Sequence, residues 1–201
     1  MKIGLFGGTF DPLHLGHLML AEAARETCDL QEVWFIPAWS PPQKQGHAIS
    51  PPKHRLEMVR LGIAGHPQFR VSRIELERQG ISYTVDTLRQ VAQAHPDDEL
   101  FLLIGGDSLH DLPTWHQPRE ILELATVIAV NRGRTPADPE PVLKALGEKY
   151  RSRIVLNTMP GVDLSATEIR ARVAAGQSIR YQTPRSVELY VSTHQLYRPA
   201  R

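Results

Sequence analysis

The sequence predicts an α/β protein of one domain, with a doubly wound parallel sheet that carries helices on both faces. Three observations support this: short apolar runs alternate with segments of helical periodicity, most of these runs are continuous, and 201 residues suffice to bury one core. Continuous apolar strands are typical of a parallel sheet that is buried on both faces. We expect a single domain over residues 1–201, with a helical C-terminal part over 157–201.

The expected elements alternate along the chain. The strands are Ile3–Phe6, Val33–Ile36, Phe69–Ile74, Leu100–Ile104, Val127–Val130 and Ile154–Leu156. The helices are His17–Cys28, Lys53–Ala64, Val85–Ala94, Arg119–Leu124, Pro141–Tyr150, Ala166–Ala174 and Arg185–Thr193. Such alternation gives βαβ units and a Rossmann-like arrangement, in which ligands bind beyond the carboxyl ends of the strands.

Composition and charge argue against several classes of protein. Lys plus Arg (23) balances Asp plus Glu (22), so neither nucleic acid nor an anionic membrane is expected as a partner. The single cysteine excludes an intrachain disulfide and a multi-cysteine zinc site. We find no signal peptide and no apolar stretch of the roughly 18 residues that would span a bilayer. A cytoplasmic location is expected, and the sequence leaves open whether the protein forms a homo-oligomer.

The first expected strand leads directly into GGTFDPLHLGH, residues 7–17. Glycines at a strand-to-helix turn allow backbone N–H groups to approach a phosphate, and the helix N-terminus behind them favours an anion. His14 and His17 can both donate hydrogen bonds to that anion. The alternatives are packed or solvated histidines, or a zinc site completed by Asp107 and His110. We prefer phosphate contact, in which fixed donors stabilise the charge of a transferred group.

A second pattern suited to phosphate lies in LSATEIR, residues 164–170. Ser165 and Glu168 have the spacing of a capping box, which predicts a helix N-terminus. By itself the segment is a capped helix with one basic residue. Ser165 and Thr167 nevertheless offer hydroxyl and backbone donors, and Arg170 can fork onto a phosphate.

Two more segments fall near the expected ligand-binding edge. GISYTVDTL, residues 80–88, has the form of a turn and a capped helix, and a purely structural role explains it equally well. IGGDSL, residues 104–109, follows an apolar strand and precedes Trp115. Trp115 is either a core residue or a platform on which a heteroaromatic ring stacks.

These motifs together resemble a known family. GTFDPLHLGH matches the G-x-F-D-P-x-H-x-G-H signature of the nucleotidylyltransferase superfamily without departure, and LSATEIR resembles its I-S-x-T-x-x-R element. With IPAWSPPQK, GISYTVDTL and IGGDSL…TWHQPREIL between them, the order is similar to that of bacterial nicotinate-nucleotide adenylyltransferases. Phosphopantetheine adenylyltransferases share only the first and last motifs and form the alternative family. Aminoacyl-tRNA synthetases share H-x-G-H but are far longer. A non-catalytic nucleotide-binding regulator and a metal-dependent hydrolase are the rival classes.

The resemblance implies transfer of the adenylyl group of ATP to nicotinate mononucleotide, with release of pyrophosphate. It makes His14 and His17 the catalytic residues, which stabilise charge on the α-phosphate. The ATP-binding residues that it implies are Gly7, Gly8, Thr9, Phe10, Lys44, Ser165, Thr167 and Arg170. The acceptor-binding residues are Tyr83, Thr84, Asp107, Trp115 and Arg132. Mg²⁺ is expected to bind mainly through the ATP phosphates, with no dedicated set of protein ligands.

Two expectations concern the chemistry of the acceptor. Its 5′-phosphate is mostly a dianion near pH 7, since the second pKa is about 6, so direct in-line attack needs no general base and no covalent enzyme intermediate. Helix N-termini after Tyr83 and near Trp115 would favour its carboxylate over a neutral amide. One departure concerns ATP, because Gln43 stands where the family often has a histidine and cannot carry a charge.

Overall fold

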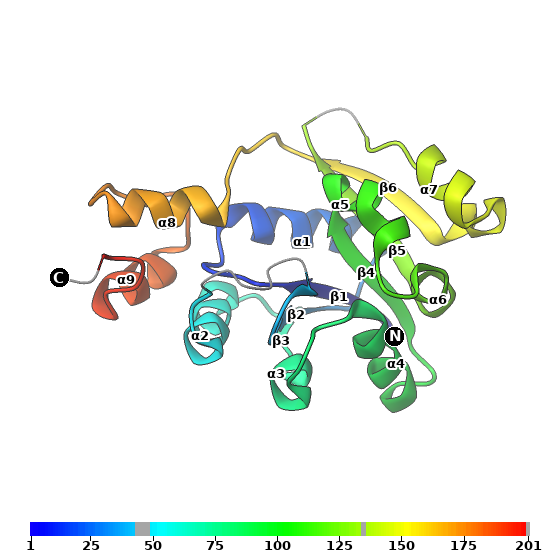
Figure 1. The fold of residues 1–201 in the computed structure, drawn as a ribbon, viewed down its shortest axis with the longest axis horizontal. Helices are drawn as coiled ribbons and strands as arrows, with labels where there is room; N and C mark the ends of the chain where they lie inside the picture. The colour runs from blue at the N-terminus through cyan, green and yellow to red at the C-terminus, as the bar shows by residue number, and fades with distance from the viewer. Residues whose placement is uncertain (43–48, 134–135, 200–201) are drawn as a thin grey trace.

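The computed structural model describes residues 1–42, 49–133 and 136–199, which form a six-stranded sheet between layers of helices (Figure 1). The strand order is β3-β2-β1-β4-β5-β6, and every pairing is parallel. The strands are β1 (Lys2–Gly8), β2 (Glu32–Pro37), β3 (Phe69–Val71), β4 (Glu99–Gly105), β5 (Thr126–Arg132) and β6 (Ile154–Met159). The predicted doubly wound parallel sheet is confirmed.

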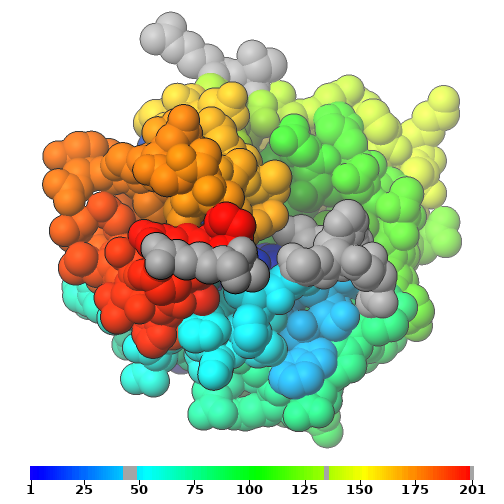
Figure 2. Space-filling model, turned by 60° about the vertical axis from the view of Figure 1, so that its left-hand side comes forward, coloured from blue at the N-terminus to red at the C-terminus, as the bar shows by residue number. Residues whose placement is uncertain are grey.

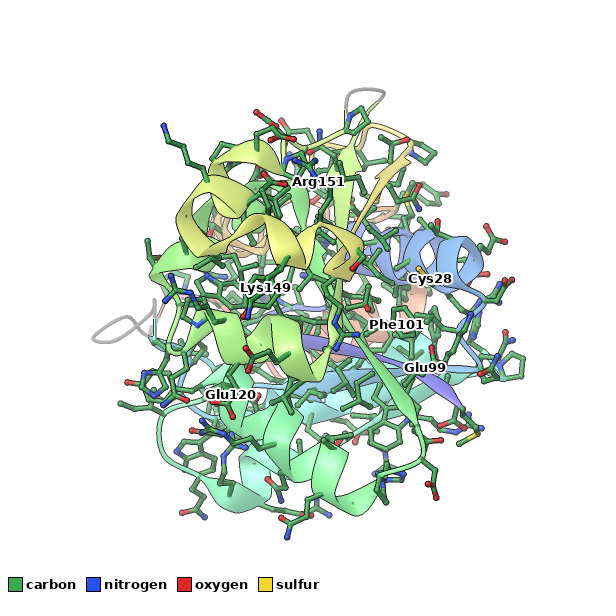
Figure 3. All side chains as sticks on the ribbon, turned by 90° about the vertical axis from the view of Figure 1, so that its right-hand side faces the viewer. Cys28, Glu99, Phe101, Glu120, Lys149 and Arg151 are labelled. Carbon is green, nitrogen blue, oxygen red and sulfur yellow. The ribbon has the colours of Figure 1, made fainter. Side chains whose placement is uncertain are left out.

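Helices cover both faces of this sheet. They are α1 (Leu15–Cys28), α2 (Pro52–Ile63), α3 (Ile74–Arg78), α4 (Thr84–Ala94), α5 (Gly106–Asp111), α6 (Pro118–Leu124), α7 (Glu140–Leu146), α8 (Ala166–Ala174) and α9 (Arg185–Thr193), with 3-10 turns η2 (Leu112–Thr114) and η3 (Glu148–Arg153). One core contains residues of α4 to α7, and the other contains residues of α1 and α2. Strand β4 contributes to both: Leu102 packs in the first core and Phe101 in the second. In Figure 3, Cys28 at the end of α1 and Lys149 in η3 lie on either side of β4.

The order of the strands creates a switch point between β1 and β4. From β1 the chain proceeds through β2 to β3, whereas from β4 it proceeds in the opposite direction through β5 to β6. The carboxyl ends of the two central strands leave space between them, because a Cβ added at Gly7 or at Gly105 would meet no atom within 4 Å. In open α/β sheets this is the place where ligands bind.

Three predicted elements differ from the structure. The third strand ends at Val71, because Ile74 starts the short helix α3 instead of continuing the strand. The helix predicted over Pro141–Tyr150 ends at Leu146, where Gly147 adopts a φ of 126°, and η3 follows. The helical C-terminal part begins at Ala166 and not at residue 157, because β6 extends through Met159.

The last two helices form a small third cluster with α2. Its buried side chains are Met58 of α2, Ile169 of α8, Val187 and Val191 of α9, and Ile179 between them. Figure 1 shows α8 and α9 next to α2 at one end of the molecule, far from α6 and α7. No helix in the described ranges is long and apolar enough to cross a membrane.

Candidate active site

The loop after β1 ends in a helix N-terminus that carries both histidines. His14 is the N-cap of α1, with extended backbone angles, and His17 lies in the first turn. The backbone N–H of His14 donates to Nδ1 of His17 at 3.2 Å, and the two rings stack with their centroids 3.6 Å apart. When His17 is neutral, this bond places its proton on Nε2, the nitrogen that can donate to an oxyanion.

The two histidines differ in their surroundings. His14 is 2% exposed, whereas His17 is partly exposed and lines the cavity described below. Burial, assisted by the nearby Arg132 guanidinium, lowers the pKa of His14 from its ordinary value of 6.5 to about 4. His14 is therefore neutral near pH 7 and supports the His17 ring that faces the cavity.

A buried arginine holds the loop from beneath. Arg55 of α2 is 1% exposed and donates to three backbone carbonyls: Thr9 at 3.1 Å, Ser50 at 2.9 Å and Trp39 at 3.4 Å. Arg55 was not among the site residues predicted from the sequence. One signal was present, because Arg55 occupies a core position of α2, three residues before the buried Met58. A charged residue at such a position indicates a buried polar network.

Asp11 connects the loop to the end of the chain. Its carboxylate is 3% exposed and accepts hydrogen bonds from the Tyr197 hydroxyl at 2.6 Å and from the Ser50 N–H at 3.0 Å. Burial, together with the Asp11 charge, raises the pKa of Tyr197, so this hydroxyl stays protonated and continues to donate. Neither residue was predicted to support the site, since 186 positions separate them in sequence.

Helix α8 lies against the same loop. Ser165 caps it, with its Oγ accepting the Glu168 N–H at 3.1 Å, as the capping motif predicts. Arg170 donates to the backbone carbonyl of Asp11 at 2.8 Å, and Arg132 at the end of β5 donates to that of Leu164 at 3.1 Å. The N-termini of α1 and α8 are thus brought together. Figure 2 shows the C-terminal helices (orange to red) meeting the cyan segment, with a small area of the blue N-terminal chain between them.

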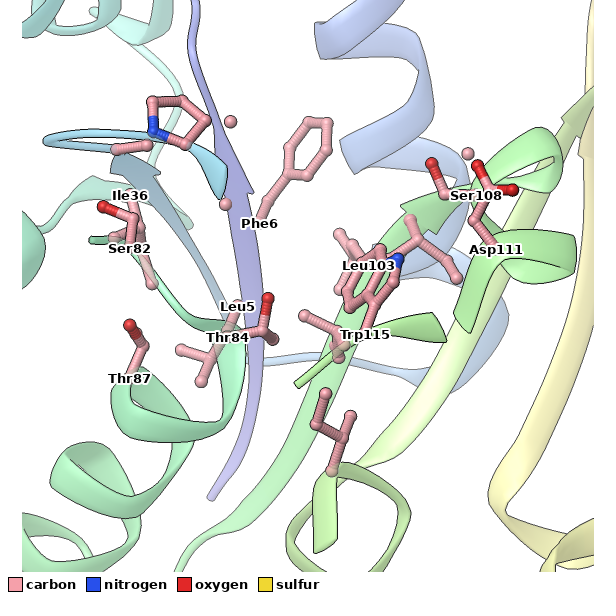
Figure 4. Close-up of a pocket in the computed structure, with 18 of the residues that line it drawn as sticks. Leu5, Phe6, Ile36, Ser82, Thr84, Thr87, Leu103, Ser108, Asp111 and Trp115 are labelled. Atoms are coloured by element: carbon pink, nitrogen blue, oxygen red, sulfur yellow. The ribbon is translucent and has the colours of Figure 1, made fainter. Parts of the chain in front are cut away.

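A cavity of about 1070 Å³ opens at the switch point. The predicted site residues that line it are Gly7, Gly8, Thr9, His17, Tyr83, Thr84, Asp107, Trp115 and Arg132. In Figure 4, Thr84 and Trp115 approach this space from opposite sides, with Leu5 of β1 and Leu103 of β4 between them. One continuous space therefore runs from the phosphate loop to the predicted acceptor residues.

The two predicted helix N-termini at the acceptor end are not alike. Tyr83 caps α4, Thr84 begins it, and the Tyr83 ring lies 4.5 Å from that of His116, centroid to centroid. Helix α6 near Trp115 starts with Pro118, which has no N–H to offer. Only the α4 terminus keeps its full set of donors for an anionic group at this end of the cavity.

The remaining predicted residues lie elsewhere. The ring of Phe10 is 2% exposed and packs against other aromatic rings, so only its backbone can take part. Ser165, Thr167 and Arg170 lie on α8, outside the lining of the cavity. Gln43 and Lys44 lie outside the described residues. Within the described part of the chain, no group of three or more His, Cys, Asp or Glu side chains could hold a metal ion.

Comparisons with known proteins show the family of this chain. The family described as cytidylyltransferase-like matches residues 5–172. A Thermomicrobium roseum protein named "Probable nicotinate-nucleotide adenylyltransferase" is 44% identical over 197 residues, covering 98% of this chain and 92% of that protein. A Thermus thermophilus protein of the same name is 44% identical over 198 residues, covering 98% and 100%. The structure of Plasmodium falciparum nicotinic acid mononucleotide adenylyltransferase complexed with NaAD has a TM-score of 0.80 at 19% identity, covering 98% of this chain and 97% of that one. This last likeness concerns the fold.

Proposed function

The chain belongs to the cytidylyltransferase-like family and, within it, to the nicotinate-nucleotide adenylyltransferases, and from this premise we propose how its residues carry out the reaction. The enzyme transfers the adenylyl group of ATP to nicotinate mononucleotide, giving nicotinate adenine dinucleotide and pyrophosphate in NAD biosynthesis. The observation that carries our assignment of residues is the meeting of two helix N-termini beside one cavity. Anions bind at such termini, and two of them can hold different phosphates of one triphosphate.

The α-phosphate of ATP binds at the N-terminus of α1. His17 donates from Nε2 to an oxygen of this phosphate, and the neutral His14 ring fixes the orientation of His17 by stacking on it. Gly7, Gly8, Thr9 and the backbone of Phe10 bring the chain close to the nucleotide. At Gly7 this approach is supported by the open space where a side chain would project. Donors placed in this way stabilise the charge that develops in the transition state.

The β- and γ-phosphates bind at the N-terminus of α8. Ser165 and Thr167 provide hydroxyl and backbone donors, and Arg170 provides a guanidinium. Mg²⁺, when bound with ATP, would supply positive charge that offsets the phosphate charge, and phosphate oxygens rather than a set of protein side chains would hold it. The residues present suit this arrangement, since the carboxylate of the loop itself, Asp11, is already engaged by Tyr197 and Ser50.

The acceptor binds between Thr84 and Trp115. The N-terminus of α4 holds the nicotinate carboxylate, the Trp115 ring lies against the pyridine, Asp107 accepts from a ribose hydroxyl and Arg132 contacts the acceptor phosphate. That phosphate, mostly a dianion near pH 7, attacks the α-phosphorus in line and expels pyrophosphate without a general base.

A pyrophosphate-release assay tests the function. The purified protein is given ATP with nicotinate mononucleotide, nicotinamide mononucleotide or phosphopantetheine in turn. We expect the highest kcat/KM with the first, because the α4 terminus favours a carboxylate over an amide. Equal kcat/KM for the acid and the amide would refute the carboxylate site. Release with phosphopantetheine alone would assign the chain to the alternative family, and ATP binding without turnover would indicate a regulator.

The role of His17 is tested by His17→Ala. Loss of one fixed donor to the transition state lowers kcat by about 100- to 1,000-fold. The KM for ATP should change much less, because the backbone donors remain. His194→Ala serves as the control. His194 is exposed at the end of α9, so this variant should have the kcat of the wild type. Near-wild-type kcat in His17→Ala would contradict the proposed charge stabilisation by His17.

A further inference from the structure

Beneath the acceptor end of the cavity lies a carboxylate that the proposed reaction does not use. Glu75 in α3 is 5% exposed and borders the cavity. The Thr87 hydroxyl donates to its Oε1 at 2.6 Å, and the Ser82 hydroxyl forms a second side-chain hydrogen bond with it. Burial raises the pKa of Glu75, while both hydroxyls and the charges of Arg78 and Arg55 act in the opposite direction.

The Ser82 hydroxyl depends on Glu75 as its acceptor. Its oxygen already accepts the backbone N–H groups of Trp39 at 2.9 Å and Ser40 at 3.4 Å. A hydroxyl has two acceptor positions and one proton to donate, so the proton must go elsewhere. Ser82 is 9% exposed, and an unused donor there would be costly. The backbone N–H of Ser82 also donates to the Ser40 carbonyl at 2.9 Å, which docks this loop onto the segment after β2.

Thr87 binds Glu75 from the opposite side of the loop. Its oxygen accepts a hydrogen bond from Arg78 at 3.0 Å, and its proton goes to Glu75 at 2.6 Å, with the Tyr83 carbonyl as a more distant acceptor at 3.5 Å. Figure 4 shows Ser82, Thr84 and Thr87 together on one side of the cavity. The two hydroxyls therefore bracket Tyr83 and Thr84, and a single carboxylate receives both.

We infer that Glu75 is a positioning residue for the acceptor: through Ser82 and Thr87 it fixes the loop whose Tyr83 and Thr84 meet the pyridine end of the mononucleotide. This inference rests on the proposed function. A carboxylate is suited to the task because all its lone pairs accept hydrogen bonds. A carboxamide accepts at one atom only, so its oxygen could serve one hydroxyl while its NH₂ group faced the other.

Glu75→Gln tests this inference, with Glu77→Gln as the matched control. Glu77 lies on the same helix with its side chain 64% exposed. In Glu75→Gln we expect the KM for nicotinate mononucleotide to rise about ten- to a hundredfold, the range for a buried donor left unpaired. The kcat and the KM for ATP should stay within about twofold, because the phosphate loop is untouched. The control should match the wild type.

A second pair of variants covers the case in which Glu75→Gln does not fold. Thr87→Ser keeps the hydroxyl and should keep the wild-type acceptor KM, whereas Thr87→Val should raise it.

The effects of Glu75→Gln and Ser82→Ala should be non-additive, since both act on one hydrogen bond. A lower Tm in Glu75→Gln with an unchanged acceptor KM would overturn the inference. Failure of the wild type to use the mononucleotide would instead overturn the proposed function.

Discussion

At the scale of single residues, the two histidines of H-x-G-H are not equivalent. The sequence presents them as a pair, but one ring is buried and the other reaches the cavity. His14 shapes the site through its backbone N–H, which fixes the tautomer of His17, and through its stacked ring. A side chain at Gly16 would disturb this packing, because its Cβ would lie 3.1 Å from the His14 ring, which would have to shift by a few tenths of an ångström.

The burial of His14 predicts a pH-dependent loss of stability. The folded pKa is about 4 against an ordinary value of 6.5, so the unfolded chain binds this proton first as the pH falls. The contribution of His14 to the free energy of unfolding is fully present above pH 6.5 and is lost as the pH falls to 4. At pH 4.5 the loss amounts to about 2–3 kcal/mol.

Urea unfolding at pH 7.5 and pH 4.5 measures this loss. The wild type should lose more stability between the two values than His14→Gln, which carries no titrating group at this position. The difference between the two proteins isolates His14 from all other titrating groups. The same loss in both would contradict a buried, neutral ring.

At the scale of elements, local sequence patterns correctly predicted the helices whose bounds are determined by local interactions. The bounds of α8 and α9 match the prediction, and at α8 the capping hydroxyl of Ser165 is in place. Helix α3 was missed because five residues hold too little periodicity, and Ile74 could equally continue a strand. Helix α5 begins at Gly106, the second of two glycines, and was not among the predicted helices.

The site residues that were not predicted from the sequence were missed for a different reason. The glycines, histidines and hydroxyls of the site were recognisable because they belong to compact motifs. Arg55, Glu75 and Tyr197 are polar groups in buried positions, and their partners come from other elements. Only the fold brings those partners together, so a single sequence shows at most that a polar residue falls at a core position.

The capping role of Ser165 can be separated from its proposed role toward ATP. Ser165→Ala removes the cap and should lower the free energy of unfolding by about 1 kcal/mol, as well as raise the KM for ATP. Ser165→Asp keeps a capping acceptor but places a negative charge beside the triphosphate. It should retain stability in urea unfolding and yet raise the KM for ATP further than Ser165→Ala. A lower KM in Ser165→Asp than in Ser165→Ala would argue against phosphate at this terminus.

At the scale of the whole molecule, the end of the chain completes a site that begins in its first strand. Arg170 and Tyr197 both bind Asp11, and Arg55 joins the same loop to the segments around Trp39 and Ser50. The sheet supplies the switch point, whereas α8 supplies the second helix N-terminus, at which we propose that phosphate binds. The buried Asp11 carboxylate and the groups that donate hydrogen bonds to it fix these two parts of the site relative to each other.

The contact between Tyr197 and Asp11 predicts that a change two residues before the last described one affects the first motif. Tyr197→Phe keeps the ring but removes the hydroxyl donor to Asp11, which leaves the backbone N–H of Ser50 bonded to that carboxylate. A buried acceptor deprived of one donor costs about 1–3 kcal/mol, measurable by urea unfolding. Because the Asp11 carbonyl also anchors Arg170, we expect the KM for ATP to rise severalfold while the acceptor KM stays constant. Tyr181→Phe, at a side chain that is 84% exposed, should change neither quantity. If Tyr197→Phe is less stable but binds ATP normally, the contact between Tyr197 and Asp11 has a structural role only, and the C-terminal anchor does not contribute to catalysis.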